Sequence, residues 1–395
     1  MKNIKNTSRF ILIALVALFV TSCNIKNDDP LVPADNSLTG IISRNPDLST
    51  FYEAVKIAGL DTPTFLGRTA TTLTVFAPNN AAFTTFLSAN GYANLSAVPV
   101  ATLTNLLKNH MVTSSIVTSS AGLSTLGADP VVSTFSGYAQ TLAESSSSTV
   151  KTITMFINNG VYTAPNTNPS TTGIFQINGV SQVITSDITA SNGVVHIINK
   201  IIPIPTLIDL ISNNPNLSSL TTAVSAPAQA TVLTKLTSAT SSLPLTVFAP
   251  DNAAFSLLTA TTGTGFGIGG STLVLSNPTN ISEILNYHLV SGNLNGAPYS
   301  LTNTDITVAS PGAKTLTTLQ SPKVLTVKFT LRVEAVPAIP ATLTSPIIPA
   351  VPAITRKHLI TDQTTGTARI ARISNYDIQA SNGVVHIVDR VMLPR

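Results

Sequence analysis

The stretch Leu73–Phe83 reads LTVFAPNNAAF, and Leu245–Phe255 reads LTVFAPDNAAF, so the two differ at one position of eleven. A second pair of stretches follows in the same order: Asp187–Ile197 reads DITASNGVVHI, and Asp377–Ile387 reads DIQASNGVVHI. Self-similarity at a long, constant period indicates that a structural unit has been duplicated. The chain therefore contains two copies of one module, and these four stretches decide its fold.

A third pair of stretches lies between the first two in each copy. Leu106–Val112 reads LLKNHMV, and Ile284–Val290 reads ILNYHLV. Start, middle and end blocks thus repeat together, which places the modules at residues 37–203 and 204–395. The second copy also carries a Pro-rich insertion at residues 335–354 (AVPAIPATLTSPIIPAVPAI), whose prolines favour an extended loop over helix or strand.

The first block predicts a strand followed by a helix. Leu73–Phe76 alternates as a strand does, Pro78 ends it, and Asn79 and Asn80 are residues that cap helices. Apolar residues upstream have helical spacing in both copies. These residues are Leu48, Phe51 and Val55, then Leu217, Leu220 and Val224.

The last block predicts a tight turn at Ser-Asn-Gly, in which Gly193 and Gly383 would tolerate positive φ. Apolar strands at Val194–Ile198 and Val384–Val388 follow this turn. Helices therefore occupy mainly the first half of each module and strands the second half, which is an α+β arrangement.

Together the three blocks resemble the fasciclin-like domain, and the resemblance covers almost everything after residue 36. It implies two tandem modules of α+β class, each a twisted β-sandwich wedge with a helical layer, and a role in extracellular adhesion. In animal relatives the Tyr-His segment has been linked to receptor binding, which makes Tyr287 and His288 candidate ligand-binding residues here. The first copy has Asn109 in place of the tyrosine.

The N-terminus reads as a signal peptide over residues 1–22. A basic start precedes the apolar run Phe10–Val20, which would rise only about 16 Å as a helix and is too short to span a hydrocarbon core of about 30 Å. Cys23, the only cysteine of the chain, follows directly. This pattern resembles the lipobox of bacterial lipoproteins, which implies a lipid on Cys23. The alternative is an ordinary signal peptide with an incidental cysteine.

Residues 23–36 are polar and read as a tether. The acidic pair Asp28-Asp29 resembles the export signal that sends lipoproteins of the Bacteroidetes to the outer face. We therefore expect a cell-envelope location, anchored to the outer membrane by the N-terminal lipid and exposed at the surface.

Charge is distributed unevenly along the chain. Residues 23–300 carry a formal charge of −4, whereas residues 301–395 carry +5, from ten Lys/Arg and five Asp/Glu. A basic face of the second module would suit an acidic glycan or another anionic surface. The candidate contacts are Arg356, Lys357, Arg369 and Arg372, of which Arg356 and Lys357 are preferred because they adjoin the Pro-rich insertion. The alternative is a scatter of solvated residues.

No motif in the sequence predicts catalysis, a cofactor or a metal site. The five histidines lack metal-ligand spacing, and the overall formal charge of +4 gives no nucleic-acid signal once the basic signal peptide is set aside. His196 and His386 lie within apolar strands, where a structural imidazole is expected. The sequence thus predicts a non-catalytic protein that binds extracellular matrix, a glycan or a cell-surface protein. Two alternatives stay open: a structural accessory subunit of a glycan-handling envelope complex, and, more remotely, a hydrolase.

Overall fold

The computed structural model divides into two units, Met1–Asn36 and Ser37–Arg395, and the second contains both modules. The structure describes residues 35–63, 65–67, 72–113, 116, 135–145, 152–160, 174–240, 243–259, 278–291, 293–294, 297–298, 313–320, 324–334, 353–361 and 370–393.

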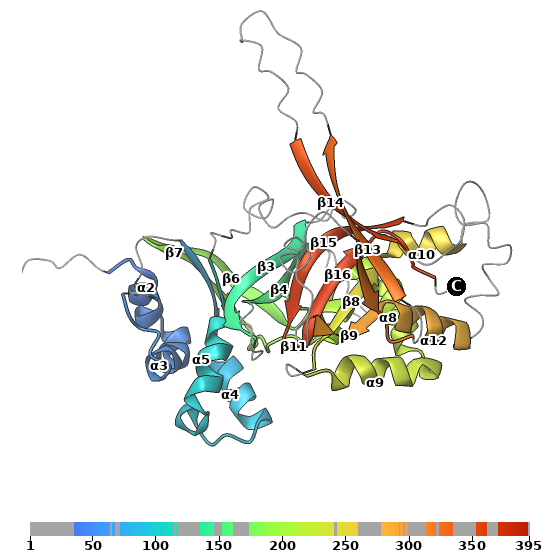
Figure 1. The fold of residues 1–395 in the computed structure, drawn as a ribbon. Helices are drawn as coiled ribbons and strands as arrows, with labels where there is room; N and C mark the ends of the chain where they lie inside the picture. Colours follow the sequence, from blue (N-terminus) through green and yellow to red (C-terminus); the bar gives the residue numbers. More distant parts are fainter. Residues whose placement is uncertain are drawn as a thin grey trace, which may run out of the picture. The chain divides into compact units, whose positions relative to one another are not determined.

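The first module places its helices before most of its strands (Figure 1). Its elements are α2 (Leu38–Arg44), η1 (Pro46–Leu48), α3 (Ser49–Ile57), β1 (Leu73–Pro78), α4 (Asn80–Ala89), η2 (Leu95–Ala97), α5 (Val100–Lys108), β2 (Met111–Val112), β3 (Phe135–Glu144), β4 (Thr152–Gly160), β5 (Ile174–Ile177), β6 (Ser181–Ala190) and β7 (Gly193–Ile198).

Among the described residues, the second module repeats the order of the strands and of most helices, and it adds η5 and α9 before β8 and a small hairpin, β10–β11. Its elements are α7 (Leu207–Ser212), η4 (Pro215–Leu217), α8 (Ser218–Ser225), η5 (Pro227–Gln229), α9 (Ala230–Ser238), β8 (Leu245–Pro250), α10 (Asn252–Thr259), α12 (Pro278–Tyr287), β9 (Leu289–Ser291), β10 (Asn293–Leu294), β11 (Ala297–Pro298), β12 (Ala313–Thr317), β13 (Val324–Glu334), β14 (Ala353–Thr361), β15 (Ile370–Ala380) and β16 (Gly383–Val388). The predicted α+β arrangement is confirmed in both modules.

The strands of each module follow one topology. In the first module β1 to β7 form a closed barrel, in which β1 pairs in parallel with β7 and the other neighbours are antiparallel. The second module has the strand order β12-β13-β14-β15-β16-β8-β9, and a bridge between Val290 and Thr318 links β9 to the residue that follows β12. The predicted sandwich of the first module is closed into a barrel. The long strands β3 and β6 connect its parts, because each pairs with a different strand on either side.

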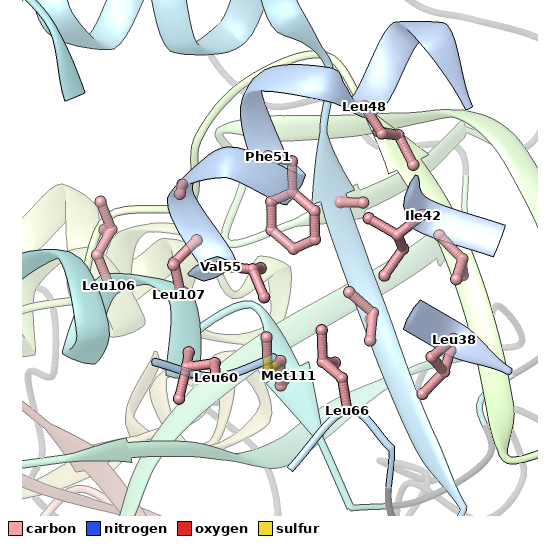
Figure 2. Packing of buried hydrophobic residues seen from close by; sticks show 14 of the residues in the cluster. Leu38, Ile42, Leu48, Phe51, Val55, Leu60, Leu66, Leu106, Leu107 and Met111 are labelled. Carbon is pink, nitrogen blue, oxygen red and sulfur yellow. The ribbon is translucent and has the colours of Figure 1, made fainter. Parts of the chain in front are cut away.

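A helical layer covers one side of the strands, as the apolar spacing predicts. Leu48, Phe51 and Val55 are fully buried in a cluster with residues of α2, α5 and β1, which Figure 2 shows from close by. Their counterparts Leu217, Leu220 and Val224 are buried in the second module.

The strand β1 is buried on both faces, so its sequence alternation does not mark an exposed side. Leu73 and Val75 belong to the helix-side cluster, whereas Phe76 belongs to a second cluster with residues of β2, β4, β5 and β7. Thr74 is also fully buried, and its hydroxyl oxygen accepts a hydrogen bond from the Ile116 N–H (2.8 Å). A central strand covered by helices on one face and by other strands on the other leaves no face for solvent.

Gly193 and Gly383 do not use the tolerance for positive φ that the sequence suggested as the reason for glycine. The described glycines with positive φ are Gly59, Gly91 and Gly179. Glycine is needed at 193 and 383 for space, because a Cβ there would collide with the carbonyl oxygen of Leu73 or Leu245 on the parallel neighbouring strand. The structure therefore assigns these two residues to the close approach of two backbones.

The asparagine before each of these glycines ties the barrel to the helices. The side-chain oxygen of Asn192 accepts from the Leu38 N–H (2.8 Å), and its amide donates to the Leu66 carbonyl (2.7 Å). Asn382 makes the equivalent bonds with Leu207 and Leu236. Side-chain bonds to the first free N–H of a helix satisfy a donor that the helix itself cannot.

The two asparagines of the first block, Asn79 and Asn80, have different roles. Asn79 caps α4 as predicted, because its side-chain oxygen accepts from the Ala82 N–H (2.9 Å). Asn80 instead accepts from the Thr50 N–H (2.9 Å) and donates to the Pro46 carbonyl (2.9 Å), which fixes α4 against η1 and α3. In the second module Asn252 has the same role, with Ser219 and Pro215 as its partners.

The predicted Pro-rich loop meets the strand β14 at its end. Ala353 and Ile354, the last two residues of residues 335–354, begin β14 and pair with Glu334 and Val333 of β13. Residues 335–352 lie outside the described residues.

Candidate functional site

The Tyr-His segment of the second module lies in the interior. Tyr287 is 0% exposed and His288 is 2% exposed. The His288 ring uses both nitrogens: Nε2 accepts from the Met392 N–H (3.0 Å), so the proton is on Nδ1, which donates to the Ile284 carbonyl (2.8 Å). Burial lowers the pKa of His288 to about 4, which keeps the ring neutral near neutral pH.

His110 of the first module is held in the same way. Its Nδ1 donates to the Leu106 carbonyl (2.8 Å), its Nε2 accepts from the Ile202 N–H (2.9 Å), and burial lowers its pKa to about 4. Asn109, at the position of Tyr287, donates to the carbonyls of Ile202 (3.2 Å) and Pro203 (3.1 Å). In both modules, therefore, this histidine joins the middle helix to the segment that leaves the last strand.

These contacts change what can be expected of Tyr287 and His288. Because both side chains are buried and His288 is bonded to the Met392 N–H, a ligand could contact them only after the residues that cover them had rearranged. A ligand contact at these two residues stays a prediction, while their packing role is visible in the structure.

The histidines within the last strands are structural, as predicted. His196 is fully buried, its Nδ1 accepts from the Asp187 N–H (3.2 Å), and its Nε2 donates to the Ile116 carbonyl (2.8 Å). The ring stacks on Phe76 with centroids 5.3 Å apart. His386 is also fully buried and stacks on Phe248 at 5.6 Å. Burial lowers the pKa of His196.

The preferred basic pair, Arg356 and Lys357, lies in β14. Arg356 is in register with Leu331 of β13, and Lys357 is in register with Thr330. Successive residues of a strand belong to opposite faces. The two residues that the sequence suggested as a joint contact are therefore on different faces of the sheet.

Arg372 shares a face of the sheet with Lys357. Its register partner Leu359 is two residues from Lys357, so Lys357 and Arg372 share a face. Arg372 is exposed, whereas its neighbours Ala371 (2%) and Ile373 (5%) are buried. By register, Lys357 therefore belongs to the same face as the exposed Arg372, opposite to the face of the buried Ala371 and Ile373.

Two further basic residues, absent from the candidate set, belong to this face. Lys328 is in register with Leu359, and Arg332 is in register with Thr355. The alternation in VLTVKFTLRVE (Val324–Glu334) could have revealed them, because every second residue from Thr326 to Glu334 is polar and every second residue from Leu325 to Val333 is apolar. Of the other candidate residues, Arg369 and Cys23 lie outside the described residues.

The part of the chain that the structure describes contains no group of three or more His, Cys, Asp or Glu placed to hold a metal ion. Among the described residues, no helix has the length and apolar character needed to cross a membrane.

Contacts between the modules were not predicted from the sequence. The Asn214 side chain donates to the Tyr138 hydroxyl (2.7 Å), and the Gln379 N–H donates to the Thr154 hydroxyl (3.0 Å). No local pattern marks them, because each bond joins residues that are far apart in the chain.

Comparison with known proteins agrees with the duplicated architecture. The family model for the Fasciclin domain matches residues 46–205 and residues 218–394. Among solved structures, the FAS1 domain pair from the insect cell adhesion molecule fasciclin I is similar, with 16% sequence identity, a TM-score of 0.46, and coverage of 88% of this chain and 97% of that chain. The comparison with curated proteins gives no match. Because the family model matches the chain twice and over most of its length, the chain belongs to the fasciclin domain family as a tandem pair of fasciclin domains.

Proposed function

We propose that this chain is a non-catalytic adhesion protein, held to the outer membrane by a lipid on Cys23, that binds a glycan or matrix component outside the cell. Fasciclin domains are linked to cell adhesion in general, and they mediate interactions with cell-surface or matrix molecules. The observation that carries the proposal is the domain organisation, because two fasciclin domains occupy nearly all of the chain beyond residue 36.

The N-terminal sequence supports the anchoring part of the proposal. Cys23 follows a short apolar run, and two or three acyl chains would hold a protein firmly, whereas one chain alone binds only marginally. If residues 23–36 act as a tether, these fourteen residues would have an extended reach of about 50 Å, which would let the domains contact material beyond the membrane surface.

The charge distribution supports the binding part. The +5 charge of residues 301–395 falls in the second module, where Lys357 and the exposed Arg372 belong to one face of the sheet by register. A surface of this kind favours acidic ligands.

Cells that carry the full chain on their surface can test the anchor and the binding separately. The variant Cys23→Ala should lose labelling by a radioactive fatty acid and should no longer retain the protein at the envelope. Cys23→Ser serves as a second variant, since it also removes the thiol but keeps a similar size.

Adhesion of these cells to immobilised glycans and matrix proteins should fall to background in both variants. The purified full-length Cys23→Ala protein should still bind the same array, because its domains are intact. Unchanged fatty-acid labelling in Cys23→Ala would contradict the anchor, and an array without any bound component would contradict the adhesion role.

A further inference from the structure

We propose that the β13–β14 hairpin of the second domain carries a site for a linear acidic polysaccharide, formed on one face by the residues Lys328, Arg332, Lys357 and Arg372. We call these four register positions the basic face. The inference rests on the proposed adhesion function and names its ligand class and its location.

The register of the hairpin places the four residues together. Lys328 and Arg332 are four residues apart in β13, and Lys357 is in register with Thr330, midway between them. Arg372 joins the same face from β15 through Leu359, the register partner of Lys328. Residues directly opposite each other in antiparallel strands share a face, so all four positions lie on one side of the sheet.

The spacing of these positions suits an extended polyanion. Two residues along a strand rise about 6.8 Å, and neighbouring strands are about 4.8 Å apart, so the backbone positions of Lys328, Lys357 and Arg332 follow one another at about 8 Å. Arg372 lies about 10 Å from Lys328, two strands away. At physiological ionic strength the screening length is also about 8 Å, so a chain of anionic groups would interact with all four cations together.

The fold alone does not account for the basic face. Like charges at neighbouring positions of a sheet are unfavourable. Among the register positions of this face in β12 to β15, Glu334 at the far end is the acidic residue, and Asp389 binds the backbone N–H of Arg372 (2.7 Å) from beside the sheet. No carboxylate therefore occupies a register position between Lys328, Lys357 and Arg332. An anionic ligand would reduce the repulsion among these cations.

The chemistry between the cations favours a polysaccharide. Thr326, Thr330, Thr355 and Thr361 occupy other register positions of the same face. Hydroxyl groups both donate and accept hydrogen bonds, which suits sugar hydroxyls. Val324, Leu359 and Ile370 are the large apolar residues at the register positions of this face in β13 to β15, too few for insertion into a lipid surface.

The opposite face of the hairpin has a different composition. It holds Val327, Phe329, Leu331 and Val333 of β13, and at its base it continues to Ala371, which is buried. Arg356 is on that face, in register with Leu331. Arg356 and Lys357 are therefore adjacent cations on opposite faces, and they provide a matched pair of variants.

The first domain lacks a counterpart. Its strands β4 (TITMFINNG) and β5 (IFQI), at the positions of β13 and β14, contain no Lys or Arg. Binding should therefore belong to the second domain alone.

The experiment measures binding of the purified full chain to alginate, a polyuronate, as a function of salt, with neutral dextran and phosphatidylglycerol vesicles as comparison probes. The variants are Lys357→Ser, its matched control Arg356→Ser, and the triple variant Lys328→Ser/Arg332→Ser/Lys357→Ser. Circular dichroism and thermal melting establish that each variant is folded before binding is compared.

We expect Lys357→Ser to weaken alginate binding about threefold to tenfold at low salt, and Arg356→Ser to change it less than twofold. The triple variant should weaken binding more than tenfold, and its slope of log Kd against log salt should fall by about two to three, because about three fewer counterions are released. Wild-type protein should not bind neutral dextran and should bind the vesicles more weakly than alginate.

Equal losses in Arg356→Ser and Lys357→Ser would overturn the assignment to one face, and so would vesicle binding as strong as alginate binding. No alginate binding by the wild type at low salt would overturn the ligand class. If cells still adhere to a matrix component in that case, the proposed adhesion function survives while this inference fails.

Discussion

The two domains share one strand topology and differ most in one pair of strands. In the first domain β4 and β5 pair over four register positions, Ile157–Gly160 with Ile174–Ile177. In the second domain the equivalent strands β13 and β14 pair over nine, and the outer six pair with no other described strand (Figure 1). What the domains have in common is therefore what the fold requires, and the extended hairpin is an addition that the fold does not need.

The shared part includes polar residues as well as the apolar core. Asn192 and Asn382 bind the helical layer in the same way, and His110 and His288 bind the exit segment in the same way. A polar residue that repeats with identical partners in both domains is explained by folding. The basic face of β13–β14 does not repeat, so its residues are the better candidates for a ligand.

The largest expected effect concerns the glycines at the start of the last strands. Replacing Gly193 by Ala should destabilise the first domain by more than about 4 kcal/mol, because the new Cβ meets a backbone carbonyl that cannot move without breaking the β1–β7 pairing. Gly383→Ala should do the same to the second domain. Urea unfolding of the full chain, followed by hydrogen exchange to assign each domain, measures both.

Gly91→Ala is the control for this pair. Gly91 has positive φ but no atom near its missing Cβ, so the substitution should cost only about 1–2 kcal/mol. A cost at Gly193 no larger than at Gly91 would show that the two backbones can separate, and the close approach would not explain the glycine.

The next effect is the loss of stability in acid that the buried histidines cause. The pKa of His110 and of His288 is about 4 in the folded state, below the ordinary value of 6.5, so the unfolded state binds protons first. Each histidine therefore contributes fully above about pH 6.5, and its contribution is lost as the pH falls toward 4, by up to about 3 kcal/mol. Urea midpoints between pH 4 and pH 8 measure this loss.

The variants His110→Asn and His288→Asn test whether the two domains are equivalent in this respect. Each should be less stable than the wild type at pH 7 and should have a smaller loss of stability between pH 6.5 and pH 4. If the pH dependence of the free energy of unfolding changed in only one of the two variants, the two histidines would contribute unequally to stability despite their shared geometry.

The smallest expected change in stability comes from removing the Pro-rich insertion, which only the second domain has. Removing residues 337–352 and joining the ends with a short Gly-Ser link should change the free energy of unfolding by less than about 0.5 kcal/mol, because the first domain has the shared fold without this segment. Thermal melting and urea unfolding measure the change. A large decrease in melting temperature would mean that the insertion packs against the domain.

The duplication, the α+β class, the buried helical stripes and the cap at Asn79 could all be predicted from the amino-acid sequence. These features depend on local periodicity and on residues within a few positions of each other, which a single sequence displays directly. The structural role of His196 was also predictable, because a histidine surrounded by strand-forming apolar residues must pair its ring nitrogens in the interior.

Roles that depend on backbone distant in the sequence could be assigned from the folded chain alone. Gly193 is needed because Leu73, far away in sequence, passes beside it, and His288 is buried because Met392 returns to bind its ring. The separation of Arg356 from Lys357 follows from their place in the strand β14, whereas the grouping of Lys357 with Lys328, Arg332 and Arg372 required the register of β13 to β15. Strand pairing is set by which chain segments meet in space, and the spacing of residues along one segment does not contain that information.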